Sequence, residues 1–263
     1  MEKNIFITGI PRSGTSLLTF LFSNNRDYLC FSEPAFVKRV KKNASTKKEV
    51  VVALEKEIND IRKKIANGVE INIRLSKGNE VPDNYFQRSA PSSGQVEKTS
   101  ELKYVIFSPE VALKNFVIKN NLLFTSCLEE LIGLGDVLAT VRHPLHTLLS
   151  WNSLDIPVSK GNVYTGEKFS QSLNELPSRQ NLLLRQIKII DWFYAKYTNN
   201  HVCLIKYEDL VVNPKQVLSP WFKDVKLPKL KSKNEIKRYT QENTQLIEHY
   251  LEKHSVLYNE VYK

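Results

Sequence analysis

Short apolar runs alternate with amphipathic stretches along most of this chain. The runs are rich in β-branched and aromatic residues and are bounded by Gly, Pro, Asn or Ser, which is typical of buried strands. They predict a strand beginning at Ile5 and further strands over residues 28–31, 104–107, 136–141 and 202–205. Apolar residues recur at helical spacing over residues 15–22 and 178–197. Because strands that alternate with helices are joined by parallel crossovers, we expect an α/β fold: a P-loop-like, doubly wound parallel sheet flanked by helices.

A long amphipathic helix is predicted over residues 46–66. Its apolar positions are Val50, Leu54, Ile58, Ile61 and Ile65. Thr46 and Glu49 have the spacing of a capping box at its start, and Gly68 follows its end. A single apolar stripe of this kind fits packing onto its own domain better than a coiled-coil partner surface.

This helix belongs to a segment, residues 38–102, that interrupts the α/β alternation. Ile71, Ile73 and Leu75 alternate with polar residues and predict an exposed strand, and residues 89–94 predict a loop. We therefore expect a single domain over residues 1–263, with an insertion at about 38–102. Since the chain leaves the sheet and returns at this point, the insertion is expected to form a lid on the substrate side.

The composition narrows the range of partners. The chain has 263 residues and a formal net charge of +10, which favours anionic partners such as a nucleotide, an acidic glycan, a nucleic acid or a membrane surface. Cys30, Cys127 and Cys203 lie far apart, without the spacing of a zinc site or a disulfide framework, so we expect buried thiols. No apolar run approaches about 18 residues and the first strand follows the initial Met closely. We expect a cytoplasmic protein without a signal peptide or a membrane span.

Residues 9–16, Gly-Ile-Pro-Arg-Ser-Gly-Thr-Ser, join the first strand to the first helix. Gly9 and Gly14 have the spacing of a Walker A loop, but Thr15 stands where a nucleoside triphosphate site needs Lys. Without that ammonium, and with Arg12 inside the loop, the segment is better suited to one terminal tetrahedral anion held by backbone N–H groups and a guanidinium. The alternative is a plain strand–turn–helix junction.

Two further segments follow predicted strands. Arg142 lies at a strand end and Ser150 two turns into the next helix, so a guanidinium and a hydroxyl can converge on one phosphate. An Arg at this position is equally typical of an ion pair that anchors the helix. Residues 207–210, Tyr-Glu-Asp-Leu, leave the last predicted strand. Tyr207 as a core aromatic, with the two acids anchoring the loop, is the structural alternative here.

In this order, the three segments resemble those of sulfotransferases that use 3′-phosphoadenosine 5′-phosphosulfate (PAPS) as the donor. The resemblance implies a 5′-phosphosulfate loop over residues 11–15, a 3′-phosphate site at Arg142 and Ser150, and Tyr207 beside the adenosine. The cofactor-binding residues that it implies are Arg12, Ser13, Gly14, Thr15, Ser16, Arg142, Ser150 and Tyr207, and no metal is expected.

The sequence Pro-Arg-Ser-Gly-Thr is closer to the tyrosylprotein and bacterial branch of that family than to the cytosolic drug and steroid enzymes. In the tyrosylprotein group, the catalytic base is a Glu 21 residues beyond the loop Arg, and Glu33 stands at that distance from Arg12. The resemblance therefore implies that Glu33 removes the acceptor proton. Arg12 is then expected to hold the anionic charge of the transferring group.

Some positions depart from the family pattern. Many relatives have Lys-Ser-Pro or Lys-Asp-Pro at the end of the strand before the 3′-phosphate motif, whereas the matching place here reads Phe-Ser-Pro at 107–109. Lys98 is a candidate replacement, which we leave outside the expected site. His143 stands where Asp is usual, and both it and His146 fit structural roles better than catalytic ones. The C-terminal Arg-Lys-Gly segment of the cytosolic branch is missing, and the candidates for its role are Lys229, Lys231 and Lys233.

The acceptor is not specified by these motifs. A glycan, a small alcohol or phenol, and a protein tyrosine all present the required hydroxyl. The alternative functions are a P-loop small-molecule kinase and a non-catalytic nucleotide-binding or nucleic-acid-binding protein. The kinase reading lacks both the Lys at Thr15 and a Mg²⁺-binding Asp on a second strand. The binding-protein reading leaves the Arg12–Glu33 pair without a role, so no nucleic acid partner is expected.

Overall fold

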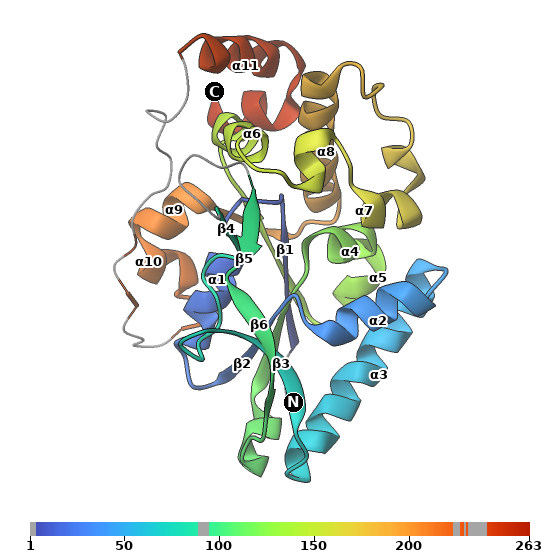
Figure 1. Ribbon diagram of the computed structural model, residues 1–263, viewed down its shortest axis with the longest axis vertical. Helices are drawn as coiled ribbons and strands as arrows, with labels where there is room; N and C mark the ends of the chain where they lie inside the picture. The colour runs from blue at the N-terminus through green and yellow to red at the C-terminus, as the bar shows by residue number, and fades with distance from the viewer. Residues whose placement is uncertain (1–3, 89–94, 223–226, 229, 231–240) are drawn as a thin grey trace.

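The computed structural model describes residues 4–88, 95–222, 227, 228, 230 and 241–263 (Figure 1). The predicted loop at 89–94 and the candidates Lys229, Lys231 and Lys233 lie outside these residues. The central sheet has five strands in the order β2-β7-β1-β8-β9. They are β1 (Asn4–Gly9), β2 (Tyr28–Ser32), β7 (Asn115–Lys119), β8 (Asp136–Val141) and β9 (Cys203–Lys206). Every pairing in this sheet is parallel, so the expected α/β fold is confirmed.

Helices cover both faces of the sheet because its strands are apolar on both sides. Along β1, Ile5 and Ile7 belong to one buried cluster and Phe6 to the other. Helices α1 (Thr15–Ser23), α9 (Tyr207–Val212) and α10 (Pro214–Leu218) pack on the first cluster and lie to the left of the sheet in Figure 1. The larger cluster is covered by α3 (Lys47–Ala66), α4 (Asn121–Ser126), α5 (Leu128–Leu131), α6 (Pro144–Asn152), α7 (Tyr164–Phe169), α8 (Leu182–Asn199) and α11 (Gln241–His254). Short 3₁₀ turns occupy Pro109–Leu113, Ile132–Leu134, Pro157–Lys160 and Gln171–Leu173.

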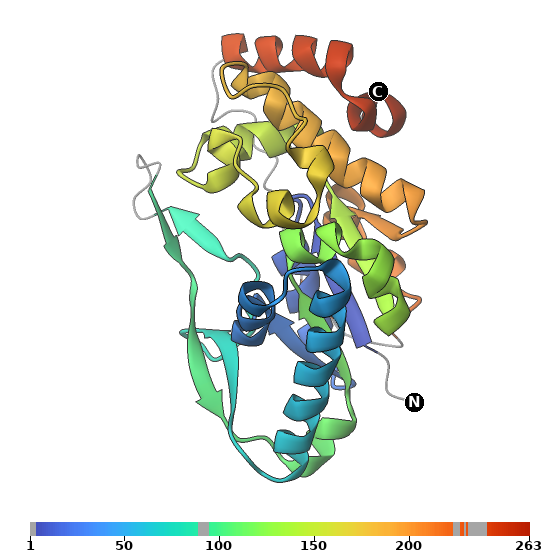
Figure 2. The same cartoon turned by 90° about the vertical axis from the view of Figure 1, so that its right-hand side faces the viewer.

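The strand predicted over residues 104–107 is not part of the central sheet, and this prediction is wrong. Residues Ser100–Val105 form β6, which pairs antiparallel with β3 (Ile71–Ser76) in a separate two-stranded ribbon (left in Figure 2). Tyr104 and Ile106 are 71% and 68% exposed, so this apolar run is not a buried one. The third strand of the sheet is instead β7, in which Phe116, Val117 and Ile118 are fully buried. An apolar run alone does not distinguish a central strand from a ribbon strand.

The chain therefore leaves the sheet after β2 and re-enters it at β7, so the segment between them is longer than residues 38–102. It begins with α2 (Ala35–Asn43), which the sequence analysis did not predict. It also includes α3, the β3–β6 ribbon and a short hairpin of β4 (Phe86–Arg88) and β5 (Val96–Lys98). Helix α3 is as predicted, because its five apolar positions are buried in its own domain and the Thr46 side chain accepts the Glu49 N–H.

Two of the three cysteines are buried as expected. Cys30 and Cys127 are free and buried, and burial raises the pKa of both thiols. Cys203 is also free but exposed, so the expectation was wrong for this residue. It lies on β9, which has a neighbour on one side only. Among the described residues, no helix has both the length and the apolarity needed to cross a bilayer.

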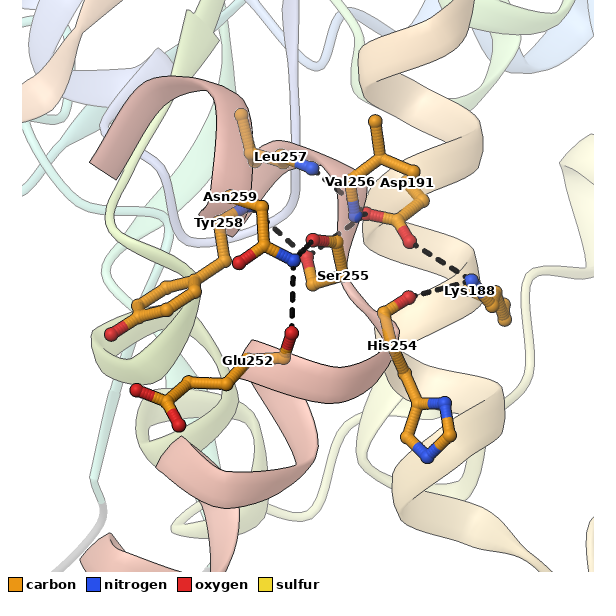
Figure 3. Close-up of polar contacts among 9 residues, drawn as sticks. All are labelled: Lys188, Asp191, Glu252, His254, Ser255, Val256, Leu257, Tyr258 and Asn259. Atoms are coloured by element: carbon orange, nitrogen blue, oxygen red, sulfur yellow. Dashed lines mark hydrogen bonds and ion pairs between the residues drawn. The ribbon is translucent and has the colours of Figure 1, made fainter. Parts of the chain in front are cut away.

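A buried carboxylate on α8 anchors the C-terminal segment (Figure 3). Oδ1 of Asp191 accepts hydrogen bonds from Ser255 Oγ and the Val256 N–H, both at 3.0 Å, and from the Leu257 N–H at 3.2 Å. Lys188 contacts the other carboxylate oxygen at 3.4 Å and donates to the His254 carbonyl at 2.6 Å. These bonds fix the start of the final turn, whose π-helical end is Tyr258–Tyr262.

Replacing this carboxylate should destabilise the protein. Asp191→Ala leaves three donors without their acceptor, two of them buried, so we expect the free energy of unfolding to fall by about 2–4 kcal/mol. Urea unfolding followed by circular dichroism measures this change. Asp155→Ala is the control, because Asp155 pairs with Lys160 on the surface and its loss should change stability by less than about 1 kcal/mol. Equal effects of the two substitutions would contradict the anchoring role.

Candidate functional site

The carboxyl ends of the five strands lie within three residues of one another in the parallel register. In the parallel register, Ser32 is opposite Lys119, Gly9 is opposite Thr140, and Val141 is opposite Lys206. The residues that directly follow these strands are Ile10, Glu33, Asn120, Arg142 and Tyr207. The segments singled out in the sequence therefore meet at one edge of the sheet, where a ligand of this fold class binds.

The loop between β1 and α1 has the shape of an anion cradle. Ser13 N–H donates to the Ile10 carbonyl at 3.0 Å, and Arg12 and Gly14 have positive φ angles of 72° and 95°. Helix α1 then begins at Thr15 with Gly14 as its N-cap and no side-chain cap. The first N–H groups of a helix have no acceptor within the helix, and they carry partial positive charge. The loop thus presents backbone donors of the kind that bind phosphate or sulfate groups.

Gly14 is required by this geometry. A Cβ at this position would lie 2.7 Å from Cδ2 of Tyr207, and its φ of 95° is unfavourable for any other residue. We expect Gly14→Ala to lower the free energy of unfolding by about 1–3 kcal/mol. The control is Gly133→Ala, because a Cβ there meets no atom within 4 Å and should change stability by less than about 0.5 kcal/mol. Urea unfolding of both variants tests this, and an unchanged Gly14→Ala protein would contradict the described loop.

The three hydroxyl residues of the loop are placed differently. Ser13 is fully buried, and its Oγ lies 2.8 Å from the Thr140 carbonyl oxygen and 2.6 Å from Thr140 Oγ1. Its hydroxyl therefore fastens the loop to β8, and its assignment to nucleotide binding stays a prediction. Thr15 and Ser16 are 4% and 8% exposed at the start of α1.

Arg12 connects the loop to the second expected motif. Its Nε donates to Ser150 Oγ at 3.3 Å, while its carbonyl accepts from Arg142 Nη1 at 3.2 Å. Trp151 Nε1 also donates to the Pro11 carbonyl at 2.7 Å. The structure thus brings three residues from different elements together. Arg12 comes from the β1–α1 loop, Arg142 from the end of β8, and Ser150 from α6.

Tyr207 lies against the same group. The Arg142 guanidinium carbon is 4.7 Å from the centre of the Tyr207 ring, within the range of a cation–π contact. The ring also lies beside Gly14, where an added Cβ would be 2.7 Å from Tyr207 Cδ2. Tyr207 is 5% exposed, so it is both a core aromatic and a neighbour of the two arginine-bearing segments.

His143 and Glu208, which lie near Arg142, form hydrogen bonds with neighbouring elements. His143 is the N-cap of α6, where its Nδ1 accepts the Leu145 N–H at 3.3 Å. Glu208 accepts the His143 N–H at 3.1 Å and the Tyr262 hydroxyl at 3.2 Å, so the C-terminal turn is tied to this edge of the sheet. Burial lowers the pKa of His143, and burial followed by the charges of His143 and Arg142 lowers that of His146 to about 4. Both imidazoles are therefore neutral near pH 7, and their assignment to structural roles stays a prediction.

Glu33 forms a second centre at the edge of the sheet. Its Oε1 lies 2.8 Å from Lys119 Nζ, and its Oε2 accepts from Asn120 Nδ2 at 2.7 Å. Its backbone has a positive φ of 48°, an unusual conformation for a Glu. Lys119 is 4% exposed, so this ion pair is largely removed from water. The carboxylate is held in one orientation by two donors from the end of β7.

Lys119 and Asn120 were missed in the sequence analysis because the third strand was assigned to residues 104–107. The third strand of the sheet therefore ends at Lys119 and not at residues 107–109. Lys119 was signalled by its position directly after the apolar run 116–118. Asn120, whose Oδ1 accepts the Leu123 N–H, is the N-cap that starts α4. Lys98 is exposed on β5, and the lysine beside Glu33 is Lys119.

The segment between β2 and β7 contacts both the β1–α1 loop and the Glu33–Lys119 pair. Asn84 Oδ1 accepts a hydrogen bond from Arg12 Nη1 at 2.9 Å. The next residue, Tyr85, has its ring centre 5.7 Å from Lys119 Nζ. Asn84 and Tyr85, which are adjacent in sequence, therefore connect the β1–α1 loop with the Glu33–Lys119 pair. Over the described residues, His, Cys, Asp and Glu form no group of three or more that could hold a metal ion.

Comparisons with known proteins give a family match and several similar structures. A family model described as "Sulfotransferase family" matches residues 4–220. The sulfotransferase domain from the curacin biosynthetic pathway is similar at 14% identity and a TM-score of 0.41, covering 95% of this chain and 90% of that one. Sulfotransferase STF9 from Mycobacterium avium is similar at 12% identity and a TM-score of 0.39, and STF1 from Mycobacterium tuberculosis H37Rv at 13% and 0.40. Each match covers 96% of this chain and 76% of the other. No curated protein matches the sequence significantly.

Proposed function

The chain belongs to the sulfotransferase family, and we propose that it transfers the sulfuryl group of PAPS to a hydroxyl group of its acceptor. One observation carries this proposal. The loop that contains Arg12, the residues Arg142 and Ser150 that contact it, and the Glu33–Lys119 pair all lie at the same edge of one parallel sheet. PAPS has a 5′-phosphosulfate and a 3′-phosphate, and each needs a group of residues that binds it. The transfer also needs a third group that acts on the acceptor hydroxyl.

The residues present fit such a donor. The N–H groups at Gly14, Thr15 and Ser16, together with the Arg12 guanidinium, are suited to the 5′-phosphosulfate. Gly14 has no side chain between the loop and Tyr207, where a Cβ would clash. Arg142 and Ser150 would bind the 3′-phosphate, and Tyr207 would lie beside the adenosine. When bound, PAPS supplies an activated sulfuryl group and a stable bisphosphate product.

Glu33 and Lys119 would have different roles in the transfer. Glu33 accepts the proton of the acceptor hydroxyl, since its carboxylate is already fixed at the strand end by two donors. Lys119, Arg12 and the loop N–H groups stabilise negative charge that develops on the sulfuryl and leaving oxygens. No metal ion is needed for either task.

The segment between β2 and β7 would form the acceptor side of this site. Its Asn84 contacts Arg12 and its Tyr85 lies against Lys119, which supports the expectation of a lid or wall over the reacting groups. The cytoplasmic location expected from the sequence is also part of this proposal.

The donor assignment is tested by titrating the protein with 3′-phosphoadenosine 5′-phosphate (PAP) and with AMP, using calorimetry. PAP should bind more tightly, because only PAP offers the 3′-phosphate. Arg142→Ala should weaken PAP binding by roughly 10–100-fold, the equivalent of a charge-assisted hydrogen bond worth about 1.5–3 kcal/mol. Arg39→Ala is the control, since Arg39 forms a surface pair with Glu57. Equal affinity for PAP and AMP would contradict the assignment.

A further inference from the structure

Three cations from different elements gather beside the Glu33–Lys119 pair. They are Lys38 on α2, Arg74 on β3 and Lys98 on β5, and we call them the cationic wall. All three belong to the segment between β2 and β7, which supplies the proposed acceptor side. None of them is part of the donor motifs.

Arg74 is the buried member of this wall. It is only 4% exposed, and its Nη1 donates to the Ser100 carbonyl at 3.1 Å. Its Nε has no hydrogen-bond acceptor within the part of the chain that the structure describes. A buried guanidinium that is not matched by a carboxylate is costly, because the charge loses its hydration.

Arg74 lies close to the same aromatic ring as Lys119. Its guanidinium carbon lies 5.4 Å from the centre of the Tyr85 ring, and Lys119 Nζ lies 5.7 Å from the same centre. Lys119 in turn contacts Glu33 at 2.8 Å. A ligand group at Arg74 would therefore be a short distance from a hydroxyl that reaches Glu33.

The charges of this region are unbalanced. Partial burial, and then the positive charges of Arg74 and Lys98, lower the pKa of Lys38, so Lys38 is repelled by both of the other cations. Glu33 attracts Lys38, but its two carboxylate oxygens already bind Lys119 and Asn120. Like charges held together in this way are typical of a site that binds an anion.

We propose that the acceptor is anionic, with a carboxylate, phosphate or sulfate group that binds at Arg74, flanked by Lys38 and Lys98, next to the hydroxyl that becomes sulfated. This inference rests on the proposed function, because it assigns the acceptor class for the same site. Arg is the side chain best suited to planar, bidentate recognition of such oxyanions. The two lysines, which are exposed, would draw the anion toward the buried guanidinium.

The test uses matched pairs of probes that differ in one acidic group. They are 4-nitrophenyl β-D-glucuronide with the glucoside, 4-hydroxyphenylacetate with 4-hydroxyphenylacetamide, and glycerol 3-phosphate with glycerol. Each is titrated into the full chain, with and without PAP, by ligand-observed NMR. The acidic member of at least one pair should bind about tenfold more tightly than its neutral partner. The pair that responds distinguishes a sugar carboxylate, a phenol carboxylate and a phosphate monoester.

Arg74→Gln should abolish this preference, whereas Lys103→Gln, on the neighbouring strand β6, should keep it. If Arg74→Gln does not fold, the double variant Lys38→Gln/Lys98→Gln, at two exposed positions, should lower the preference at least threefold. No preference for the acidic member in any pair would overturn the proposal, as would a preference that survives in the folded wall variants. Loss of PAP binding alone would count against the donor assignment only, because the preference is also measured without nucleotide.

Discussion

Glu33→Gln should lower the turnover of PAPS by roughly 10²–10⁴-fold, the usual contribution of a general base. The amide keeps the size of the side chain and a carbonyl oxygen that can accept from Lys119 or Asn120, so the site should remain assembled. It has no carboxylate to accept the acceptor proton. Turnover is measured as PAP released from PAPS in the presence of a panel of phenols, alcohols and sugars.

Binding of PAP separates a catalytic effect from a structural one in this variant. We expect PAP affinity within about threefold of the unmodified protein, because Glu33 is assigned to the acceptor and not to the nucleotide. Glu57→Gln serves as the matched control, since Glu57 pairs with Arg39 on the surface. Turnover that stays unchanged in Glu33→Gln would exclude Glu33 as the base.

Lys119→Met should lower turnover by roughly 10²–10³-fold, the range found when one group that stabilises transition-state charge is removed. Met has a similar length and no charge, so it keeps the packing against Tyr85 and removes the ammonium. The substitution also leaves the Glu33 carboxylate with Asn120 as its remaining partner from β7.

The activity of the double variant Glu33→Gln/Lys119→Met tests whether the two residues act together. Since they contact each other at 2.8 Å, the double variant should lose less activity than the product of the two single losses. Lys103→Met is the control for removal of a lysine, because Lys103 bonds to Asn79 and Glu101 in the ribbon. Full activity in Lys119→Met would show that the end of β7 has no part in the reaction.

The grouping of the residues that we propose for the donor could be predicted from the sequence, because it depends on local pattern. Gly14 and Arg12 lie in a short loop whose shape is set by the strand before it and the helix after it. Arg142 and Ser150 are related by helical spacing within one strand–helix junction. The parallel sheet then brings both segments to the same edge, as its register requires.

The acceptor half could be predicted only in part. Glu33 follows a strand that the sequence marks clearly, but Lys119 follows one of two apolar runs that look alike. The run at 104–107 was chosen, although Tyr104 and Ile106 are exposed and β7 is the buried strand. Which run enters the sheet depends on its pairing with β1 and β2, and those contacts are distant in sequence.

The contacts of Asn84, Tyr85 and Arg74 could not be predicted at all. They depend on where the ribbon and the hairpin pack, and the sequence gives only their strand pattern. Cys203 was assigned to the interior for a similar reason, because a cysteine in an apolar strand is buried only if that strand is covered on both sides. It lies on β9 at the edge of the sheet.

The central claim is that this edge of the sheet binds a 3′-phosphorylated adenosine nucleotide beside Glu33 and Lys119. A crystal structure of the chain with PAP tests it most directly. We expect the 5′-phosphate within hydrogen-bond distance of the N–H groups of Gly14 to Ser16, and the 3′-phosphate in contact with Arg142 and Ser150. Binding of PAP at any other place, or with its 3′-phosphate free of both residues, would contradict the account.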